Sequence, residues 1–181
     1  MKKVPTILLF CLLVILTVGC SSTKNANAQA EAKKQAELDK AKYNEALASF
    51  YKDTDLTFSY SEEILTKYLE YWDLLGADSV DAAMAVSRET RDKANELFEG
   101  LPDNLKLVSE AAKQYPEEYQ EIYDETKNLY ETTIALMEQV NSPSGNYITF
   151  TENTTTLSQD YKSNRVLIDA LLSDDVKELI E

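Results

Sequence analysis

Apolar residues recur every three or four positions over long stretches of the chain, and short segments with glycine or proline separate these stretches. The clearest stripe contains Tyr43, Leu47, Phe50, Thr54, Thr57, Ser61, Ile64, Tyr68, Tyr71 and Leu75. Alternating spacings of four and three are typical of a helix that packs along its length against other helices. The stripe predicts a helix over 43–75 that ends at Gly76. Its polar middle, around "KDTDLT" at 52–57, leaves a break there open.

A thinner stripe of small and apolar residues predicts a second helix over 79–99. Asp78 is its expected N-cap, because a carboxylate can accept hydrogen bonds from the free N–H groups of a first turn. Gly100 followed by Pro102 predicts that this helix stops there. A short helix then fits residues 103–114.

The C-terminal third of the chain shows the same pattern. Pro116 suits a first helical position, and the stripe that follows predicts a helix over 116–140. "NSPSGN", residues 141–146, has the composition of a turn. Thr149 and Glu152 have the spacing of a capping box, which predicts a helix from near 150 to 171. Ser173 and the two aspartates after it predict a cap for a last short helix.

These elements predict an all-α fold, an antiparallel bundle of three to four long amphipathic helices. We expect the bundle to occupy residues 37–172 and to be followed by a short helical tail, 173–181. The polar, alanine-rich residues 20–36 read as a tether, flexible at first and then helical. No alternation typical of strands is present.

The first twenty residues, MKKVPTILLFCLLVILTVGC, have a different pattern. Lys2 and Lys3 precede a mostly apolar run over 4–18. A membrane-spanning helix needs roughly 20 apolar residues. A short apolar run behind a basic start is instead typical of a secretory signal.

The end of this segment, Thr17-Val18-Gly19-Cys20, resembles the lipobox of bacterial lipoproteins, although Thr17 stands where leucine is usual. The resemblance implies that Cys20 receives a diacylglycerol on its sulfur and that residues 1–19 are cleaved off. Two acyl chains give stable anchoring. We therefore expect a lipid-anchored protein on the extracytoplasmic face of a bacterial cell membrane.

Charge limits the classes of partner that the chain can bind. Removing residues 1–19 takes away Lys2 and Lys3, so the 18 basic residues become 16 against 32 acidic ones, a net charge of −16. A surface this acidic disfavours nucleic acid as a partner.

The chain has no histidine, and its two cysteines are Cys11, in the signal, and Cys20. This composition excludes Ser-His-Asp and Cys-His catalysis and histidine-ligated zinc. We expect no enzymatic activity, no cofactor and no metal. The acidic residues over 117–125 read as a solvated helix face rather than a calcium site.

Aromatic residues are the candidate binding residues. Tyrosine and tryptophan combine a large apolar face with a polar tip and are favoured in interfaces, but they also suit the rim of a core. The candidates are Tyr68, Tyr71, Trp72, Tyr119, Tyr123 and Tyr130.

Polar residues within the stripes raise a second question. These residues are Thr54, Thr57, Ser61, Ser87, Thr126, Thr133, Thr154 and Asn164. They could line a pocket inside the bundle, or they could bond to carbonyls of their own helices. The sequence thus favours a non-enzymatic lipoprotein that binds a protein or an envelope component. The alternative is a small-ligand sensor or carrier that uses this polar seam.

Overall fold

The computed structural model describes residues 22–76 and 79–181, with side chains from Asn27 onward. The described residues form six α-helices and no strand, so the predicted all-α fold is confirmed. The helices are α1 (Ser22–Leu75), α2 (Val80–Val86), α3 (Arg88–Gln114), α4 (Pro116–Asn141), α5 (Tyr147–Leu171) and α6 (Asp174–Ile180). The lipobox with Cys20, and the expected cap Asp78, lie outside the described residues.

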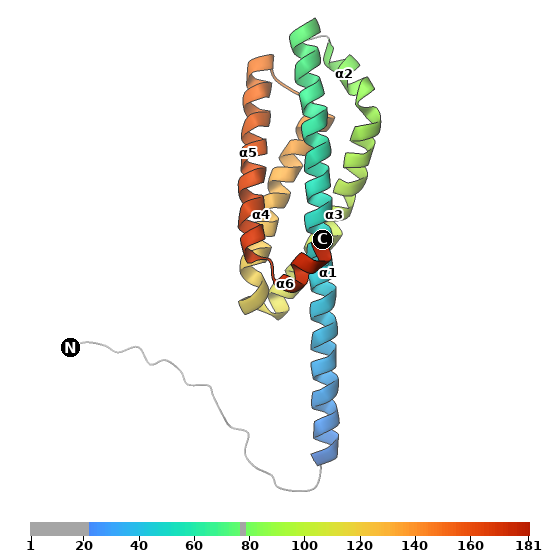
Figure 1. Ribbon diagram of the computed structural model, residues 1–181, viewed down its shortest axis with the longest axis vertical. Coiled ribbons are helices and arrows are strands. Elements are labelled where there is room, and N and C mark those ends of the chain that lie inside the picture. Colours follow the sequence, from blue (N-terminus) through green and yellow to red (C-terminus); the bar gives the residue numbers. More distant parts are fainter. Residues whose placement is uncertain (1–21, 77–78) are drawn as a thin grey trace, which may run out of the picture. The chain divides into compact units, whose positions relative to one another are not determined.

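The chain divides into two compact units, residues 1–36 and 37–181. Within the second unit, α1 from Glu37 onward lies beside α3, α4 and α5 (Figure 1). Hydrogen bonds connect these four helices, and we call them the four-helix core. Tyr43 on α1 donates to Gln114 on α3 over 2.8 Å, and Tyr68 donates to the carbonyl of Val140 on α4 over 2.9 Å.

Directions alternate along the chain. The start of α1 within this unit meets the end of α3, and Ser158 in the middle of α5 donates to Glu62 of α1 over 3.1 Å. Further along α5, Tyr51 of α1 bonds to Asp169, so α1 and α5 are antiparallel. Short connections between α3, α4 and α5 favour this up-and-down arrangement. The short helix α6 returns toward α1, where Lys52 donates to the carbonyl of Leu179 over 2.6 Å.

The predicted apolar stripes form the interior of this unit. The largest fully buried side chains are Tyr68, Tyr161, Phe50, Phe150, Leu47, Ile64, Leu101, Leu129, Leu136, Ile168, Val108 and Val140. Among the described residues, all buried core residues lie between Tyr43 and Val176, so residues 37–181 contain a core of their own.

The polar seam is mostly buried, and most of its hydroxyls bond within their own helices. Thr57 donates to the carbonyl of Asp53 and Ser61 to that of Thr57, both over 2.7 Å. The same bond to the residue four positions back is made by Thr54, Thr126, Thr133 and Thr154. These bonds satisfy the buried hydroxyls within the helix, and α1 continues through 52–57 without a break.

The predicted stop at Gly100 and Pro102 is wrong. Helix α3 passes through both residues, which are exposed, while Leu101 between them is completely buried. Pro102 has no N–H for the helical hydrogen bond, and this loss costs about 3 kcal/mol. Burial of Leu101 and, one heptad on, Val108 offsets that cost through contacts that the local sequence does not reveal.

The predicted single helix over 79–99 is also wrong, because the chain bends at Ser87 and divides it into α2 and the start of α3. The N–H of Ser87 still donates to Ala83, and its carbonyl accepts from Arg91. Both Ala83 and Ser87 are fully buried, so packing of small side chains sets the bend. In Figure 1, α2 and α3 follow one bowed path.

Several helix ends lie where the local capping residues predict them. Helix α1 ends one residue before Gly76, α4 begins at Pro116, and Ser173 accepts from the N–H of Val176 at the start of α6. The expected start of α5 is wrong: Asn146 caps a helix that begins at Tyr147. Asn146 is a better N-cap than Thr149, because it is already extended and its side chain reaches the third helical N–H.

Candidate functional site

The second unit has an apolar surface where α1 ends, α2 begins and α4 turns into α5. A groove of about 410 Å³ lies there, lined by Trp72, Val80, Asp81, Met84, Asn141, Ser142, Pro143 and Gly145. Large apolar side chains of the adjoining turns are open to solvent: Leu75 is 68% exposed and Ile148 67%. Leu74, which projects from the other side of α1 from Trp72, is 77% exposed. We call the groove, these three residues and Tyr147 the apolar end.

This surface forms because the apolar stripes of two helices extend past the helices that cover them. Along the stripe of α1, Tyr68 is fully buried, Tyr71 is half-buried and Leu75 is mostly exposed. On α5, Phe150 is fully buried while Tyr147, at the helix start, is exposed. Apolar patches left open in this way are typical of interaction surfaces.

An aromatic cluster forms the floor of the apolar end. The ring of Trp72 lies 5.6 Å from that of Phe150 and 6.2 Å from that of Tyr147, measured between centroids. Below them, the ring of Tyr68 lies 6.5 Å from that of Phe150. Aromatic pairs at these separations are attractive, so the floor is held in place before any partner arrives.

The turn after α1 is fixed by backbone and hydroxyl bonds. Gly76 has a φ of +84°, a backbone conformation that residues other than glycine rarely adopt. Its N–H donates to the carbonyl of Trp72 over 3.0 Å. The hydroxyl of Ser79 lies 2.7 Å from the carbonyl of Tyr71 and 2.5 Å from that of Gly76. The chain is therefore bonded back onto the last turn of α1 before it enters α2.

The turn before α5 is equally constrained. Gly145 has a φ of +97°, and a Cβ at this position would lie 2.6 Å from the hydroxyl of Thr149. That hydroxyl accepts from the N–H of Asn146 over 3.0 Å, while the Asn146 side chain accepts from the N–H of Thr149 over 3.0 Å. This reciprocal capping box fixes the first turn of α5, which presents Tyr147 and Ile148.

Two further contacts join α3 to this end of the unit. Asn95 and Asn141 exchange side-chain amide hydrogen bonds of 3.2 and 2.8 Å. Arg91 lies 3.5 Å from the hydroxyl of Tyr68. Burial raises the pKa of Tyr68, an effect that Arg91 partly opposes, so the hydroxyl stays protonated and keeps its bond to Val140.

The predicted binding residues Tyr68, Tyr71 and Trp72 all lie at this end. Tyr68 is fully buried, so it supports the surface from beneath, whereas Tyr71 and Trp72 are half-buried and Trp72 lines the groove.

Tyr119, Tyr123 and Tyr130 lie elsewhere. Tyr119 is buried near the start of α4 and donates to Asn44 over 2.9 Å. Tyr130 is half-buried, with its ring 6.0 Å from that of Phe98. Tyr123 is also half-buried and packs against the core. The structure therefore does not bring the six aromatic candidates together on one surface.

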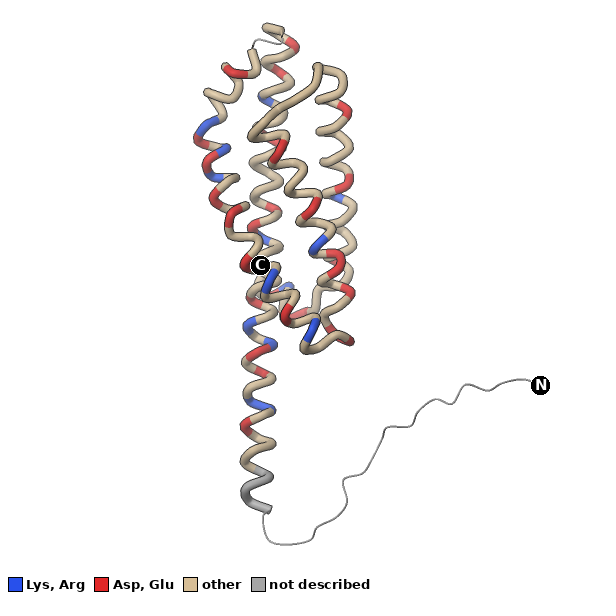
Figure 2. Tube along the Cα trace, turned by 180° about the vertical axis from the view of Figure 1, so that it is seen from behind, with Lys and Arg blue, Asp and Glu red and all other residues tan. Residues whose placement is uncertain are grey.

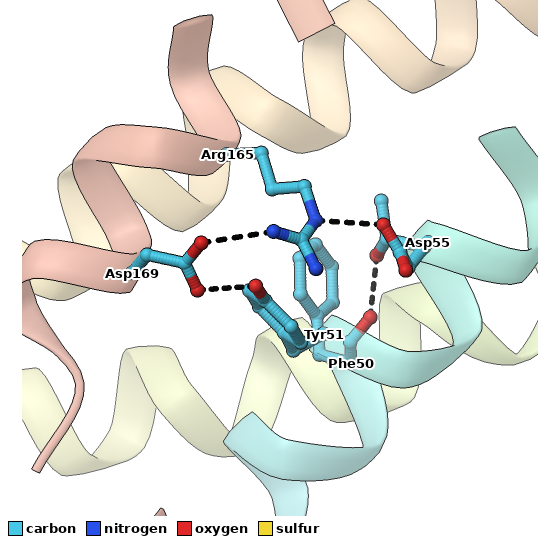
Figure 3. Close-up of polar contacts among 6 residues, drawn as sticks. Phe50, Tyr51, Asp55, Arg165 and Asp169 are labelled. Carbon is cyan, nitrogen blue, oxygen red and sulfur yellow. Dashed lines mark hydrogen bonds and ion pairs between the residues drawn. The ribbon is translucent and has the colours of Figure 1, made fainter. Parts of the chain in front are cut away.

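A polar cluster between α1 and α5 was not identified from the sequence. Figure 3 shows Arg165 of α5 between two carboxylates, bonded to Asp55 over 2.7 Å and to Asp169 over 2.8 Å. Its guanidinium lies 4.6 Å from the centre of the Tyr51 ring, and the Tyr51 hydroxyl donates to Asp169. Residues about 110 positions apart meet here, so no local pattern could have indicated it.

The polar groups in this cluster satisfy one another. Burial would lower the pKa of Arg165, but the hydrogen bond with Asp55 and the nearby negative charges raise it above its usual value. Burial, and then the hydrogen bond with Asp169, raise the pKa of Tyr51. Arg165 and Tyr51 thus both stay protonated at neutral pH, and the cluster joins α5 to α1.

A second, larger groove of about 730 Å³ runs between α1 and α5, with polar walls that include Glu62, Ser158 and Lys162 over Leu65 and Leu69. Lys162 and Glu62 pair over 2.7 Å, and Lys67 pairs with Glu63 over 2.5 Å. Among the described residues, no cluster of histidine, cysteine, aspartate or glutamate could hold a metal ion.

None of the helices within the described residues is long and apolar enough to cross a membrane. Comparison of the chain with protein-family models, with curated proteins and with solved structures gave no match.

Proposed function

We propose that this protein is a lipid-anchored, extracytoplasmic bacterial lipoprotein that acts as a non-enzymatic binding module for a protein partner through its apolar end. The resemblance of Thr17-Val18-Gly19-Cys20 to a lipobox supports the anchoring. The proposal includes no catalytic step.

The apolar end is the single observation that carries the binding function. Full burial of a leucine or isoleucine side chain contributes about 1.5–3 kcal/mol. Most of this free energy is not gained in the free chain, because Leu74, Leu75 and Ile148 are mostly exposed. Two capped turns hold these residues, so little conformational entropy is lost when a partner covers them.

The position of the apolar end suits a tethered module. The chain enters the second unit at Glu37, and Leu75 lies at the other end of the same helix. At a rise of 1.5 Å per residue, the two are separated by about 57 Å. A protein held through its N-terminal segment would thus present the apolar end at the opposite end of this unit.

The alternative, a small-ligand carrier that uses the polar seam, has less support. A ligand in the seam would need several free hydroxyls, yet six of the seven, among them Thr57, Ser61 and Thr133, already donate to carbonyls of their own helices. Among the described residues, only the Ser87 hydroxyl of the seam has no hydrogen-bond partner. We therefore favour the protein-binding function.

Site-specific photo-crosslinking in living host cells tests the binding function. The full chain carries a benzophenone amino acid at position 75 or 148, and in the control at position 166, because Val166 is 65% exposed on the outer face of α5. We expect one dominant crosslinked protein from positions 75 and 148 and none from 166. Equal crosslinking at all three positions, or none at any, would contradict the proposal.

The anchor needs its own test. We expect the wild-type chain to incorporate an alkyne-labelled fatty acid and to fractionate with membranes. The Cys20→Ser variant should lose both properties. A Cys20→Ser chain that still incorporates label would show that Cys20 is not the lipidated residue.

A further inference from the structure

Two long stretches of chain around the apolar end contain acidic residues but no basic ones. Residues 68–87 and 128–161 contain no lysine and no arginine. These stretches supply the end of α1, the whole of α2, the end of α4 and the start of α5. Figure 2 accordingly shows no blue segment on the turn between α4 and α5.

Exposed carboxylates border the apolar surface. Asp81 lines the groove itself, Asp73 lies one residue from the exposed Leu74, and Glu152 lies on the second turn of α5. The cations that flank the first stretch lie outside it: Lys67 pairs with Glu63, Arg88 is exposed at the first position of α3, and Arg91 lies 3.5 Å from the Tyr68 hydroxyl. Arg88, one helical turn after Met84, is thus the basic residue nearest to the groove along the chain. A partner therefore meets an apolar surface with an acidic rim.

We propose, resting on the function proposed above, that the partner presents a cationic amphipathic protein segment to this surface. Its apolar side chains occupy the groove beside Trp72, Met84 and Pro143, and its lysines or arginines face Asp73, Asp81 and Glu152. An amphipathic helix suits such a groove, because residues spaced three and four apart project from one side of it.

Charge complementarity distinguishes this partner from other occupants. A second copy of the chain would bring the same acidic rim against itself, and like charges facing each other oppose association. An anionic lipid surface or a nucleic acid is repelled for the same reason. A cationic segment is attracted on approach and gains apolar contact once seated.

Trp72 provides a direct readout, because it is the only tryptophan of the chain and lines the groove. The experiment uses residues 22–181, which contain this core. Three tryptophan-free peptides are titrated while Trp72 emission is recorded. One is a 14-residue leucine-lysine amphipathic helix, the second replaces each lysine by glutamate, and the third has the composition of the first with its leucines dispersed around the helix.

We expect a saturable change in Trp72 emission with the leucine-lysine helix, at an affinity at least tenfold higher than for either other peptide. The double variant Asp81→Asn/Glu152→Gln should lose most of this advantage at low salt. The matched control Asp103→Asn/Glu117→Gln removes the same charge from exposed positions on α3 and the first turn of α4, and should bind as the wild type does.

Four results would overturn the inference. Equal binding of the glutamate peptide would show that the rim does not select charge. Equal binding of the dispersed peptide, or an equal loss of affinity in both double variants, would show that the acidic protein attracts any cationic peptide and that the apolar end has no special role. Binding of no peptide would exclude a cationic segment. In each case, crosslinks from positions 75 and 148 would still support the binding function, so the two failures can be distinguished.

Discussion

Tyr161 carries a buried hydroxyl whose removal should stabilise the protein. Its side chain is 1% exposed, and its ring stacks on that of Phe58 with 3.9 Å between centroids. Among the described residues, its hydroxyl has no hydrogen-bond partner. The substitution Tyr161→Phe keeps the ring in place and removes only this oxygen.

The expected magnitude follows from the cost of desolvation. A buried polar group without a partner costs about 1–3 kcal/mol. Tyr161→Phe should therefore raise the free energy of unfolding by about 1 kcal/mol, the lower end of that range, since a methylene-sized void remains.

Tyr51→Phe is the matched variant with the opposite expected sign. Its hydroxyl donates to the carboxylate of Asp169 in the cluster with Arg165. Hydrogen bonds to charged groups contribute about 1.5–3 kcal/mol, and partial exposure of the carboxylate reduces this. We expect Tyr51→Phe to lower the free energy of unfolding by about 1 kcal/mol.

Urea denaturation of residues 22–181, followed by circular dichroism at 222 nm, measures both changes. The dependence of the unfolding free energy on urea should be the same in all three proteins, because each unfolds the same core. A Tyr161→Phe variant less stable than the wild type by about 1 kcal/mol would refute the reasoning, because its hydroxyl would then have to make a favourable bond.

Three further predictions concern the backbone and the tyrosines. Pro102→Ala should raise the free energy of unfolding by about 2 kcal/mol, because it restores a helical hydrogen bond in α3; unchanged stability in urea would mean that the missing bond costs the folded state nothing. Gly145→Ala should lower that free energy by at least about 1 kcal/mol, given its positive φ and the short contact with Thr149. Gly100→Ala, which meets nothing in α3, should raise it by about 0.5–1 kcal/mol; the same sign for both glycines would contradict this account. Finally, burial raises the pKa of Tyr119 to about 12 and also raises that of Tyr161. The folded state therefore keeps protons that unfolded tyrosines lose near pH 10, so stability is complete below pH 10 and falls as the pH rises toward 12. Absorbance at 295 nm should show these tyrosines ionising only as the helical signal is lost, and their ionisation near pH 10 with the helices intact would disprove it.

The sequence by itself determined the helices and most of their ends. The spacing of three and four is a local property, and burial of the stripes from Tyr43 to Ile168 follows from it. Gly76 and Ser173 act through bonds to neighbouring residues, and Pro116 acts through its fixed φ at the start of α4, so all three could be identified locally. The apolar character of Trp72, Leu75 and Tyr147 was also visible, but not that their surfaces would stay open.

Only the tertiary structure decided where packing overrides the local structural preference of a residue. Pro102 remains inside α3 because Leu101 is buried against other helices, and Ser87 bends the chain because the core fixes it there. The cluster of Tyr51, Asp55, Arg165 and Asp169 joins residues about 110 positions apart. The apolar end exists because the stripes of α1 and α5 extend past the helices that cover them. These features depend on contacts between distant segments, and a periodic sequence specifies which faces are apolar without specifying how far each neighbour covers them.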